Sequence, residues 1–400
     1  MEIADLSLPA NPLAAHYSCF RVAERLLLTG HSHQAWPDCA RRGLLEAFED
    51  ASALVDEKWG PAFAKADRVA RGLAERLSDS SGSYALADST HSLIVKWLSA
   101  LPCRQRRRIV TTDGEFHTLR RQLARLQEEG FDIVRVPSSP SDAISARLAA
   151  AVDDRTLAVM VSAVLFRTAE IVPDLGRVQA AADRVGAAYL VDAYHAVNVI
   201  PFPLRELGLE RAFVVGGGYK YLQLGEGNAF LRVPAEQQMR PVLTGWFAEF
   251  SALASHHDPG RVAYGPGASA FAAATYDPTS QYRAAAVLDF LDTQGLDVTL
   301  LRAVSQHQVG LLKRRFEGLD LAPAVITPAS KVPLERLAGF LALSSPWAGE
   351  ISRALAERGV ATDYRDTTLR LGPAPYLSDR QLEDAMGLLG EVVRGLENSG

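Results

Sequence analysis

The chain has 400 residues, of which 48% are hydrophobic, and its 42 basic and 47 acidic residues give a formal net charge of −5. These values predict a soluble globular protein with a large core divided over two or three domains. Nucleic acid and membranes are not expected as partners, because the chain has no long run of one charge and no stretch of about 18 apolar residues.

The cysteines and the N-terminus indicate the compartment. Cys19, Cys39 and Cys103 lack the spacing of metal ligands, and a sparse, odd number of cysteines favours a reducing environment. The first residues do not have the basic region and apolar run of a secretory signal. We therefore expect a cytoplasmic protein without a bound metal.

The first 36 residues are irregular in pattern, and two helices are expected after them, one beginning near Pro37 and one at about 62–77. Seven short apolar runs follow, mostly separated by helix-like segments; they cover 84–88, 108–112, 131–136, 156–164, 187–193, 212–217 and 228–233. This alternation predicts an α/β fold with a mainly parallel seven-stranded sheet between layers of helices.

After about residue 245 the alternation gives way to a stretch rich in Gly, Pro, Ser and Thr. Helices are then expected at about 282–291 and 297–315, before short strands and two further helices. The predicted organisation is an N-terminal segment that packs on the small domain, a large cofactor-binding domain, an interface loop and a smaller C-terminal α+β domain. Their ranges are 1–30, 31–260, 261–281 and 282–400.

The most informative stretch contains Asp192, which ends one apolar run, and Lys220, which follows three glycines after the next run. A carboxylate at the end of an apolar strand is costly unless a cation or hydrogen-bond donors meet it. Bound pyridoxal phosphate needs a lysine amine for its aldehyde and a carboxylate that keeps its pyridine nitrogen protonated. Each residue alone is a weak signal, but together with His195 they predict this cofactor.

These segments resemble a known family. DAYHAVNVIPFPL and GGGYKYLQLGEGNAFLRV look like the D-x-A-H and Y-K-Y-L segments of kynureninases, which belong to the class V aminotransferase group of fold type I pyridoxal-phosphate enzymes. The likeness runs from about residue 30 to the C-terminus. It implies an enzyme that uses pyridoxal phosphate and acts on a small amino-acid substrate.

The resemblance also implies where the cofactor is held. ADST is similar to the family's phosphate-binding turn, and Ser89 and Thr90 in it precede a helix whose free N–H groups would bind an anion. GEFHTL is similar to the segment that stacks on the cofactor ring, with Phe116 as the stacking residue and His117 as the alternative. A plain helix cap and a core aromatic are the structural alternatives.

Further roles follow from the same resemblance. His195 would orient Asp192 or approach the cofactor's ring hydroxyl, and otherwise it is an ordinary buried histidine. Tyr219 resembles a tyrosine that reaches the phosphate and takes part in proton transfer. Lys220, released as a free amine beside the substrate, is the expected general base, with Asp192 as its catalytic partner.

The segment DYRDTTLRLGPAPYL is similar to the family's carboxylate-binding region. Arg370 in this segment would bind the substrate α-carboxylate, because a guanidinium forms two parallel hydrogen bonds with a carboxylate. Arg365 is a weaker candidate, and an intramolecular salt bridge of Arg370 is the alternative.

The resemblance further suggests a homodimer with shared active sites, in which Trp246, Thr275 or Ser280 reaches the phosphate of the neighbouring subunit's cofactor. Two-fold dimers are the commonest oligomers. Simple turns are the alternative for these loops.

Two departures from the family pattern are visible. Leu119 stands where kynureninases carry an acidic residue that helps to set the polarity around the ring oxygen of the cofactor, and three glycines replace a Thr-containing approach to the lysine. We therefore expect hydrolytic Cβ–Cγ cleavage of kynurenine or a related substrate, with transamination or β-elimination as alternatives. A cysteine desulfurase would need a cysteine well after the lysine, and none follows Cys103. An inactive binding protein would have lost Lys220 or Asp192.

Overall fold

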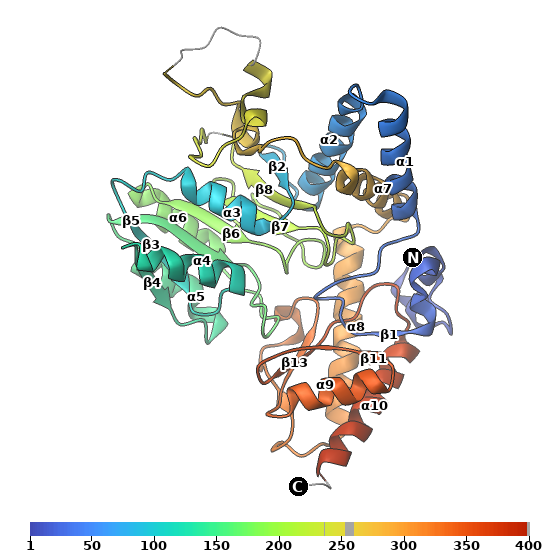
Figure 1. Cartoon of the computed structure of the whole chain (residues 1–400). Coiled ribbons are helices and arrows are strands. Elements are labelled where there is room, and N and C mark those ends of the chain that lie inside the picture. Colours follow the sequence, from blue (N-terminus) through green and yellow to red (C-terminus); the bar gives the residue numbers. More distant parts are fainter. Residues whose placement is uncertain (236, 253–259, 398–400) are drawn as a thin grey trace.

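The computed structural model describes residues 1–235, 237–252 and 260–397, and a seven-stranded sheet lies at its centre (Figure 1). In spatial order its strands are β2 (Ser83–Ala87), β8 (Ala229–Val233), β7 (Phe213–Gly217), β6 (Ala188–Asp192), β5 (Thr156–Ser162), β3 (Arg108–Thr112) and β4 (Asp132–Val136). Only β8 runs against the others. The predicted α/β fold and all seven predicted strands are confirmed.

Helices cover both faces of this sheet (Figure 1). They are α3 (Thr90–Ser99), α4 (His117–Glu128), α5 (Ile144–Ala151) and α6 (Leu175–Val185). The strands are apolar on both sides, so that Val159 and Val161 of β5 join one buried cluster while Ala158 and Met160 join the other. Strands buried on both faces explain the continuous apolar runs of the sequence.

A group of three helices packs beside the sheet, namely α1 (Cys39–Leu54), α2 (Trp59–Arg76) and α7 (Thr279–Thr293). The α1 and α7 backbones approach closely at Gly43, where a Cβ atom would lie 2.6 Å from the Tyr282 carbonyl oxygen. Glycine is therefore required at this crossing. No helix in the described part of the chain is long and apolar enough to cross a membrane.

The C-terminal part contains a second sheet. Its antiparallel strands are β12 (Asp363–Arg365), β13 (Thr368–Leu371), β10 (Leu341–Ser344) and β9 (Thr327–Pro328), packed with α8 (Val298–Gly318), α9 (Ala348–Glu357) and α10 (Asp379–Glu397). Short 3-10 helices complete the chain at Ile3–Ser7, Pro12–Phe20, Val22–Glu24, Ser141–Ala143, Trp246–Ala252, Gly267–Phe271 and Leu334–Arg336.

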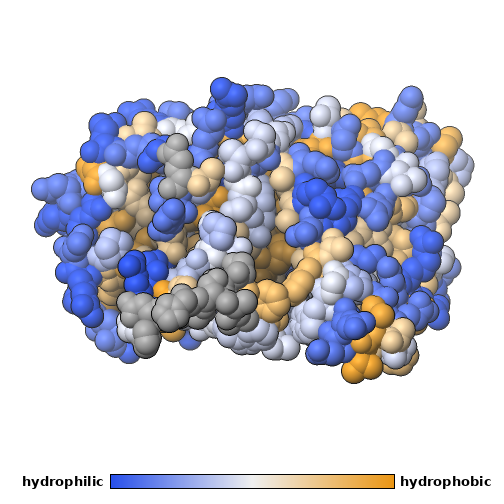
Figure 2. Space-filling view, turned by 90° about the horizontal axis from the view of Figure 1, so that it is seen from above, coloured by the Kyte–Doolittle hydropathy of each residue, from blue (hydrophilic) through white to orange (hydrophobic). Residues whose placement is uncertain are grey.

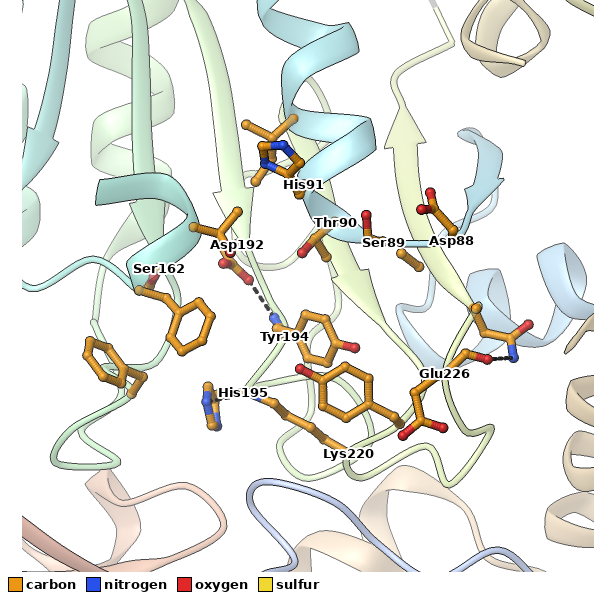
Figure 3. Close-up of a pocket in the computed structure, with 18 of the residues that line it drawn as sticks. Asp88, Ser89, Thr90, His91, Ser162, Asp192, Tyr194, His195, Lys220 and Glu226 are labelled. Atoms are coloured by element: carbon orange, nitrogen blue, oxygen red, sulfur yellow. Dashed lines mark hydrogen bonds between the residues drawn. The ribbon is translucent and has the colours of Figure 1, made fainter. Parts of the chain in front are cut away.

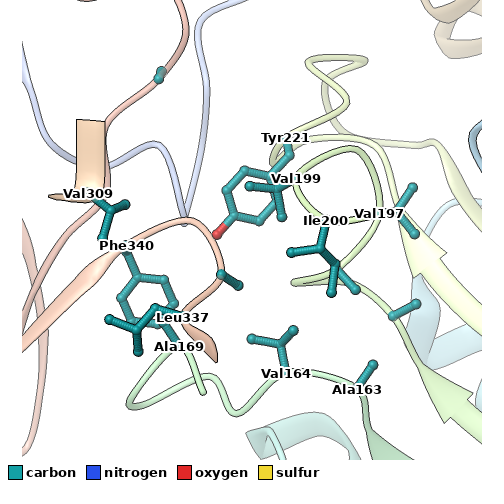
Figure 4. Packing of buried hydrophobic residues seen from close by; sticks show 14 of the residues in the cluster. Ala163, Val164, Ala169, Val197, Val199, Ile200, Tyr221, Val309, Leu337 and Phe340 are labelled. Atoms are coloured by element: carbon teal, nitrogen blue, oxygen red, sulfur yellow. The ribbon is translucent and has the colours of Figure 1, made fainter. Parts of the chain in front are cut away.

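The N-terminal segment lies against this C-terminal part. β1 (Leu26–Leu27) pairs with β11 (Val360–Ala361), and the Asn11 amide donates to the carbonyls of Pro375 and Leu377. A buried apolar cluster also joins the loops after β5 and β6 to the C-terminal part, where Val164 and Ile200 lie near Leu337 and Phe340 (Figure 4). The exact division into domains stays a prediction.

The sheet places several chain segments at one edge. Ser162, Asp192 and Val215 lie in register at the carboxyl ends of β5, β6 and β7. Ala87 ends β2 only a few residues before α3 begins. Ligands of α/β sheets bind at this edge, and the candidate site lies there.

Candidate active site

A cavity of about 220 Å³ opens at the carboxyl ends of the strands (Figure 3). Its lining comes from segments far apart in the sequence, with α3, the strand ends and the loop after β7 all contributing. The residues are Asp88, Ser89, Thr90, His91, Ile94, Phe116, Thr118, Ser162, Val164, Phe166, Asp192, Tyr194, His195, Tyr219, Lys220, Glu226, Gly227, Asn228 and Ala229.

Lys220 is the buried cation of this cavity, with 6% of its surface exposed. Its Nζ lies 2.7 Å from Nε2 of His195. Burial lowers the pKa of Lys220 to about 7, although the nearby Asp192 carboxylate opposes the shift. A large fraction of this amine is therefore neutral and nucleophilic near pH 7.

His195 is the other partner in this contact. Burial and the neighbouring Lys220 charge hold the pKa of His195 well below its usual value, so the imidazole is neutral. Its Nδ1 is buried and has no hydrogen-bond partner within the described residues. An unpaired polar atom at the wall of a cavity indicates that a ligand or water is needed there.

Asp192 ends β6 and faces the same cavity (Figure 3). One carboxylate oxygen accepts a 2.9 Å hydrogen bond from the backbone N–H of Tyr194. Burial raises the pKa of Asp192, while this hydrogen bond and the Lys220 charge oppose the shift. A bound cationic N–H would stabilise the ionised carboxylate further.

The other end of the cavity is suited to an anion. Ser89 is the N-cap of α3, and its hydroxyl accepts a hydrogen bond from the backbone N–H of Ser92. Ser89 and Thr90 both line the cavity at the start of the helix, as Figure 3 shows. The helix N-terminus and the two hydroxyls together fit a phosphate group.

Phe116 and His117 have different positions. Phe116 lines the cavity, and Nζ of Lys220 lies 5.6 Å from the centre of its ring. His117 is exposed and packs against Phe116 and Phe166 outside the cavity lining. The geometry thus supports Phe116 as the stacking residue and does not support the alternative, His117.

Tyr219 also lines the cavity, and its ring stacks on His33 with 4.6 Å between the centroids. Its other neighbour is Tyr194, at 5.0 Å. Tyr194 was not singled out from the sequence, although its signal is visible: the D-x-A-H motif has a Tyr in place of the Ala.

Arg370 is held by its own chain. One Nη donates to the carbonyl of Phe166 at 2.8 Å, and the other forms an ion pair with Asp363. Asp363 also pairs with Arg365 and approaches the buried His31. The intramolecular salt bridge, which was the alternative to substrate binding by Arg370, is therefore present.

A role for Arg370 in substrate binding nevertheless stays a prediction. Its Nε is buried without a partner in the described part of the chain, so the guanidinium retains an unused donor. Phe166, whose carbonyl it binds, lines the cavity. Arg365 is more exposed and is directed to Asp363 and a backbone carbonyl.

The three candidates for contacts across a dimer lie outside the cavity lining of their own chain. Trp246 and Thr275 are exposed. Ser280 donates to the carbonyl of Gly227, which does line the cavity. The single chain leaves their predicted role open, because the residues that they would contact belong to a second subunit.

Leu119 does not face the cavity. It is 1% exposed and packs in the core between α4 and the sheet, in the same cluster as Leu93 and Leu123. The apolar residue at this position therefore serves packing.

A buried acid next to the site was missed by the sequence analysis. Glu115 accepts hydrogen bonds from the Thr112 hydroxyl and from the backbone and hydroxyl of Ser162. Burial raises its pKa to about 7, and the Asp192 charge acts in the same direction. The signal in the sequence is the position of Glu115 between the end of a strand and the start of a helix, next to Phe116.

Among the described residues, no group of three or more His, Cys, Asp or Glu side chains could hold a metal ion. The donor set instead fits pyridoxal phosphate. An amine, a carboxylate, an aromatic ring and an anion-binding helix start face one cavity, and the unpaired His195 Nδ1 offers a further polar contact.

Comparison with known proteins agrees with this assignment. No family model matches the chain. A kynureninase of Burkholderia pseudomallei is 28% identical over 409 residues, covering 96% of this chain and 93% of the relative. A kynureninase of Deinococcus radiodurans is 29% identical over 346 residues, covering 83% of this chain and 79% of the relative.

Solved structures share the fold at lower identity. The cystine C-S lyase C-DES with its product cysteine persulfide has a TM-score of 0.78 at 16% identity, over 92% of this chain and 98% of that chain. The cysteine desulfurase CsdA of Escherichia coli has a TM-score of 0.76 at 16% identity, over 98% and 99%. The chain is therefore similar to kynureninases over most of its length and shares the fold of these solved structures.

Proposed function

We propose that the chain is a pyridoxal-phosphate-dependent enzyme that cleaves the Cβ–Cγ bond of kynurenine or a related amino acid by hydrolysis. One observation supports the cofactor above all others: the buried Lys220 amine, with its pKa lowered to about 7, shares a cavity with Asp192 and the start of α3. Perturbed ionisable groups that meet in a cleft are typical of catalytic sites.

Each part of the cofactor has a partner in this proposal. Lys220 would hold the aldehyde carbon, Asp192 the ring nitrogen, and Phe116 one face of the ring. Ser89, Thr90 and the first N–H groups of α3 would hold the phosphate. When bound, the cofactor supplies a ring that accepts the electrons of a bond broken at the substrate α-carbon.

The protein's own residues move the protons. The Lys220 amine, once released by the substrate, takes a proton from the α-carbon and returns one later, since its lowered pKa permits both steps near neutrality. His195 is hydrogen-bonded to this amine and restricts its position. Tyr219, which also borders the cavity, is the proposed proton donor or relay.

The substrate assignment rests on the relatives named kynureninase, which align over 96% of the chain. Hydrolysis would release alanine and an anthranilate-type product. A desulfurase reaction is disfavoured because no cysteine follows Cys103. β-Elimination and transamination remain alternatives, since they would use the same Asp192, Lys220 and Arg370.

A substrate test separates these reactions. Purified protein with pyridoxal phosphate is incubated with kynurenine and with 3-hydroxykynurenine, and the products are identified by mass spectrometry. We expect alanine and the matching anthranilate. A keto acid formed while pyridoxamine phosphate accumulates would establish transamination instead, and a Lys220→Ala variant controls for the uncatalysed reaction.

We also propose that the protein is a homodimer with shared sites. Several large apolar side chains are exposed on the single chain, among them Phe48, Val55, Val242 and Trp246. Apolar surface is visible among the polar residues on the face seen in Figure 2. An interface between two subunits would cover apolar side chains of this kind.

A further inference from the structure

Tyr194 places an aromatic ring inside the cavity, two residues after Asp192 (Figure 3). Its backbone N–H is fixed by the Asp192 carboxylate at 2.9 Å. Nζ of Lys220 lies 4.7 Å from the centre of the Tyr194 ring and 5.6 Å from that of Phe116. The rings of Tyr194 and Phe116 therefore both lie close to the Lys220 amine.

The two rings do not pack on each other within the described contacts. Phe116 contacts His117 and Phe166, whereas Tyr194 contacts Tyr219. Phe116 and Tyr194 both line the same cavity. A planar ring stacks on an aromatic residue at roughly 3.5 Å, so a slot with two aromatic walls suits a flat heterocycle.

The end of β7 leaves room for the Tyr194 ring because it carries Gly217. A Cβ atom at Gly217 would lie well inside 3.0 Å of three atoms of the Tyr194 phenol, so no larger residue fits while the ring is there. At the preceding Gly216, a Cβ atom would meet the ring of Phe230 instead. Gly217, one of the three glycines that depart from the family pattern, therefore makes room for Tyr194.

From this arrangement we propose that Tyr194 is a cofactor-binding residue, which forms the second aromatic wall of the ring slot opposite Phe116 and depends on Gly217 for its position. The inference rests on the proposed function, because the planar ligand is pyridoxal phosphate. A protonated pyridine ring carries positive charge, and the electron-rich face of a phenol attracts it. The Ala of the D-x-A-H motif offers only a methyl group at this place.

The experiment measures cofactor binding directly. Apoprotein variants are titrated with pyridoxal phosphate, and the apparent Kd and the dissociation rate are followed by visible absorbance, with circular dichroism as the folding control. Tyr194→Ala is expected to raise Kd roughly tenfold, since loss of one stacking ring under a planar heterocycle costs on the order of 1–3 kcal/mol. Tyr194→Phe keeps the ring and should remain within about twofold of wild type.

Substitutions at Gly217 and at the neighbouring Gly216 form a matched pair of variants. Gly217→Ala should weaken binding as Tyr194→Ala does, because the new methyl group displaces the phenol. Gly216→Ala, on the same strand, should leave Kd unchanged even if it lowers stability through Phe230. In the double variant Tyr194→Ala/Gly217→Ala, the second change should have no additional effect on Kd.

The outcomes are distinct. A wild-type protein that does not bind pyridoxal phosphate overturns the proposed function. Wild-type binding with an unchanged Kd in Tyr194→Ala overturns the inference alone, and so does tighter binding in that variant, which would mean that the phenol occupies the place of the cofactor. Additive effects of Tyr194→Ala and Gly217→Ala would also contradict it.

Discussion

At the scale of single residues, the site depends on ionisable groups whose surroundings are fixed by burial. Lys220, His195 and Asp192 lie together where water is largely excluded, so desolvation dominates the pKa of each. As a result His195 is neutral near pH 7, and a large fraction of the Lys220 amine is neutral there as well. This arrangement suits a nucleophilic amine.

The pH dependence of cofactor capture follows from Lys220. Its pKa is lowered, so the reactive neutral amine is scarce well below pH 7 and predominates above it. The rate at which apoprotein binds pyridoxal phosphate should therefore rise between about pH 6 and 8 and then level off. Stopped-flow absorbance measures this rate.

Two variants serve as controls for that measurement. Lys220→Ala should lose the visible absorbance band of the bound cofactor, whereas the exposed Lys331→Ala should behave as wild type. A rate that continues to increase up to pH 10 would show that the pKa of Lys220 is not lowered.

Arg370 gives the second prediction at this scale. Arg370→Ala should raise KM for the amino-acid substrate at least tenfold, because a carboxylate loses a charged hydrogen-bond partner, and should change the Kd of the cofactor much less. Steady-state kinetics and a cofactor titration compare the two effects. Equal damage to both would assign Arg370 to structure through Asp363, and Arg365→Ala is the matched control.

At the scale of elements, the edge of the sheet is stabilised by a buried ion pair. Arg232 of β8 and Asp79, after α2, are almost fully buried and joined by hydrogen bonds of 2.8 and 3.1 Å. Arg232 also donates to the carbonyls of Glu210 and Ala212. The pair thus connects β8, the loop before β7 and the turn before β2.

Breaking this pair should destabilise the fold. Asp79→Ala leaves the Arg232 charge buried, which costs about 3–5 kcal/mol of the free energy of unfolding. Urea denaturation of the apoprotein measures the change, and Glu129→Ala, which breaks the exposed pair with Arg125, should cost less than about 1 kcal/mol. Similar values for the two variants would contradict this view.

The same pair has a defined pH dependence. Burial raises the pKa of Asp79, but Arg232 and nearby hydrogen-bond donors together outweigh burial and lower the pKa to about 2, below its usual value of 3.8. Its contribution is therefore complete above about pH 4 and is lost as the pH falls towards 2. Neutral pH is suitable for the comparison.

At the scale of the whole molecule, shared sites can be tested by mixing subunits. If Trp246 of one chain serves the Lys220 site of the other, a mixed dimer of Lys220→Ala and Trp246→Ala chains contains one intact site. We expect wild-type cofactor affinity at half the sites of that mixed dimer, which neither parent shows. Differently tagged chains allow its isolation, and titration by absorbance gives the stoichiometry.

A mixed dimer without any wild-type site would place Trp246 in the site of its own chain. Wild-type cofactor affinity in the Trp246→Ala parent would place Trp246 outside any site. Analytical ultracentrifugation of each parent is the control for assembly. A monomeric wild type would contradict the dimer proposal itself.

The local sequence pattern was sufficient to predict much of the fold of this protein. All seven strands followed from apolar runs, because strands buried on both faces carry little else, and each predicted range agrees with a strand of the central sheet. Asp192 and Lys220 were recognisable only in combination, because a carboxylate that ends an apolar strand is costly without a partner and an amine follows the next strand.

Only the tertiary structure shows the features that depend on long-range packing, namely the partners and the burial of particular side chains. Arg370 has an ion-pair partner because β13 lies beside β12, which carries Asp363. Leu119 is buried because its side of α4 faces the sheet. The fit between Tyr194 and Gly217 arises from two strand ends that are adjacent only in the sheet. The sequence by itself indicated an α/β fold and which groups to expect in the site, and the folded chain decided their partners, because burial and contact depend on residues distant in the sequence.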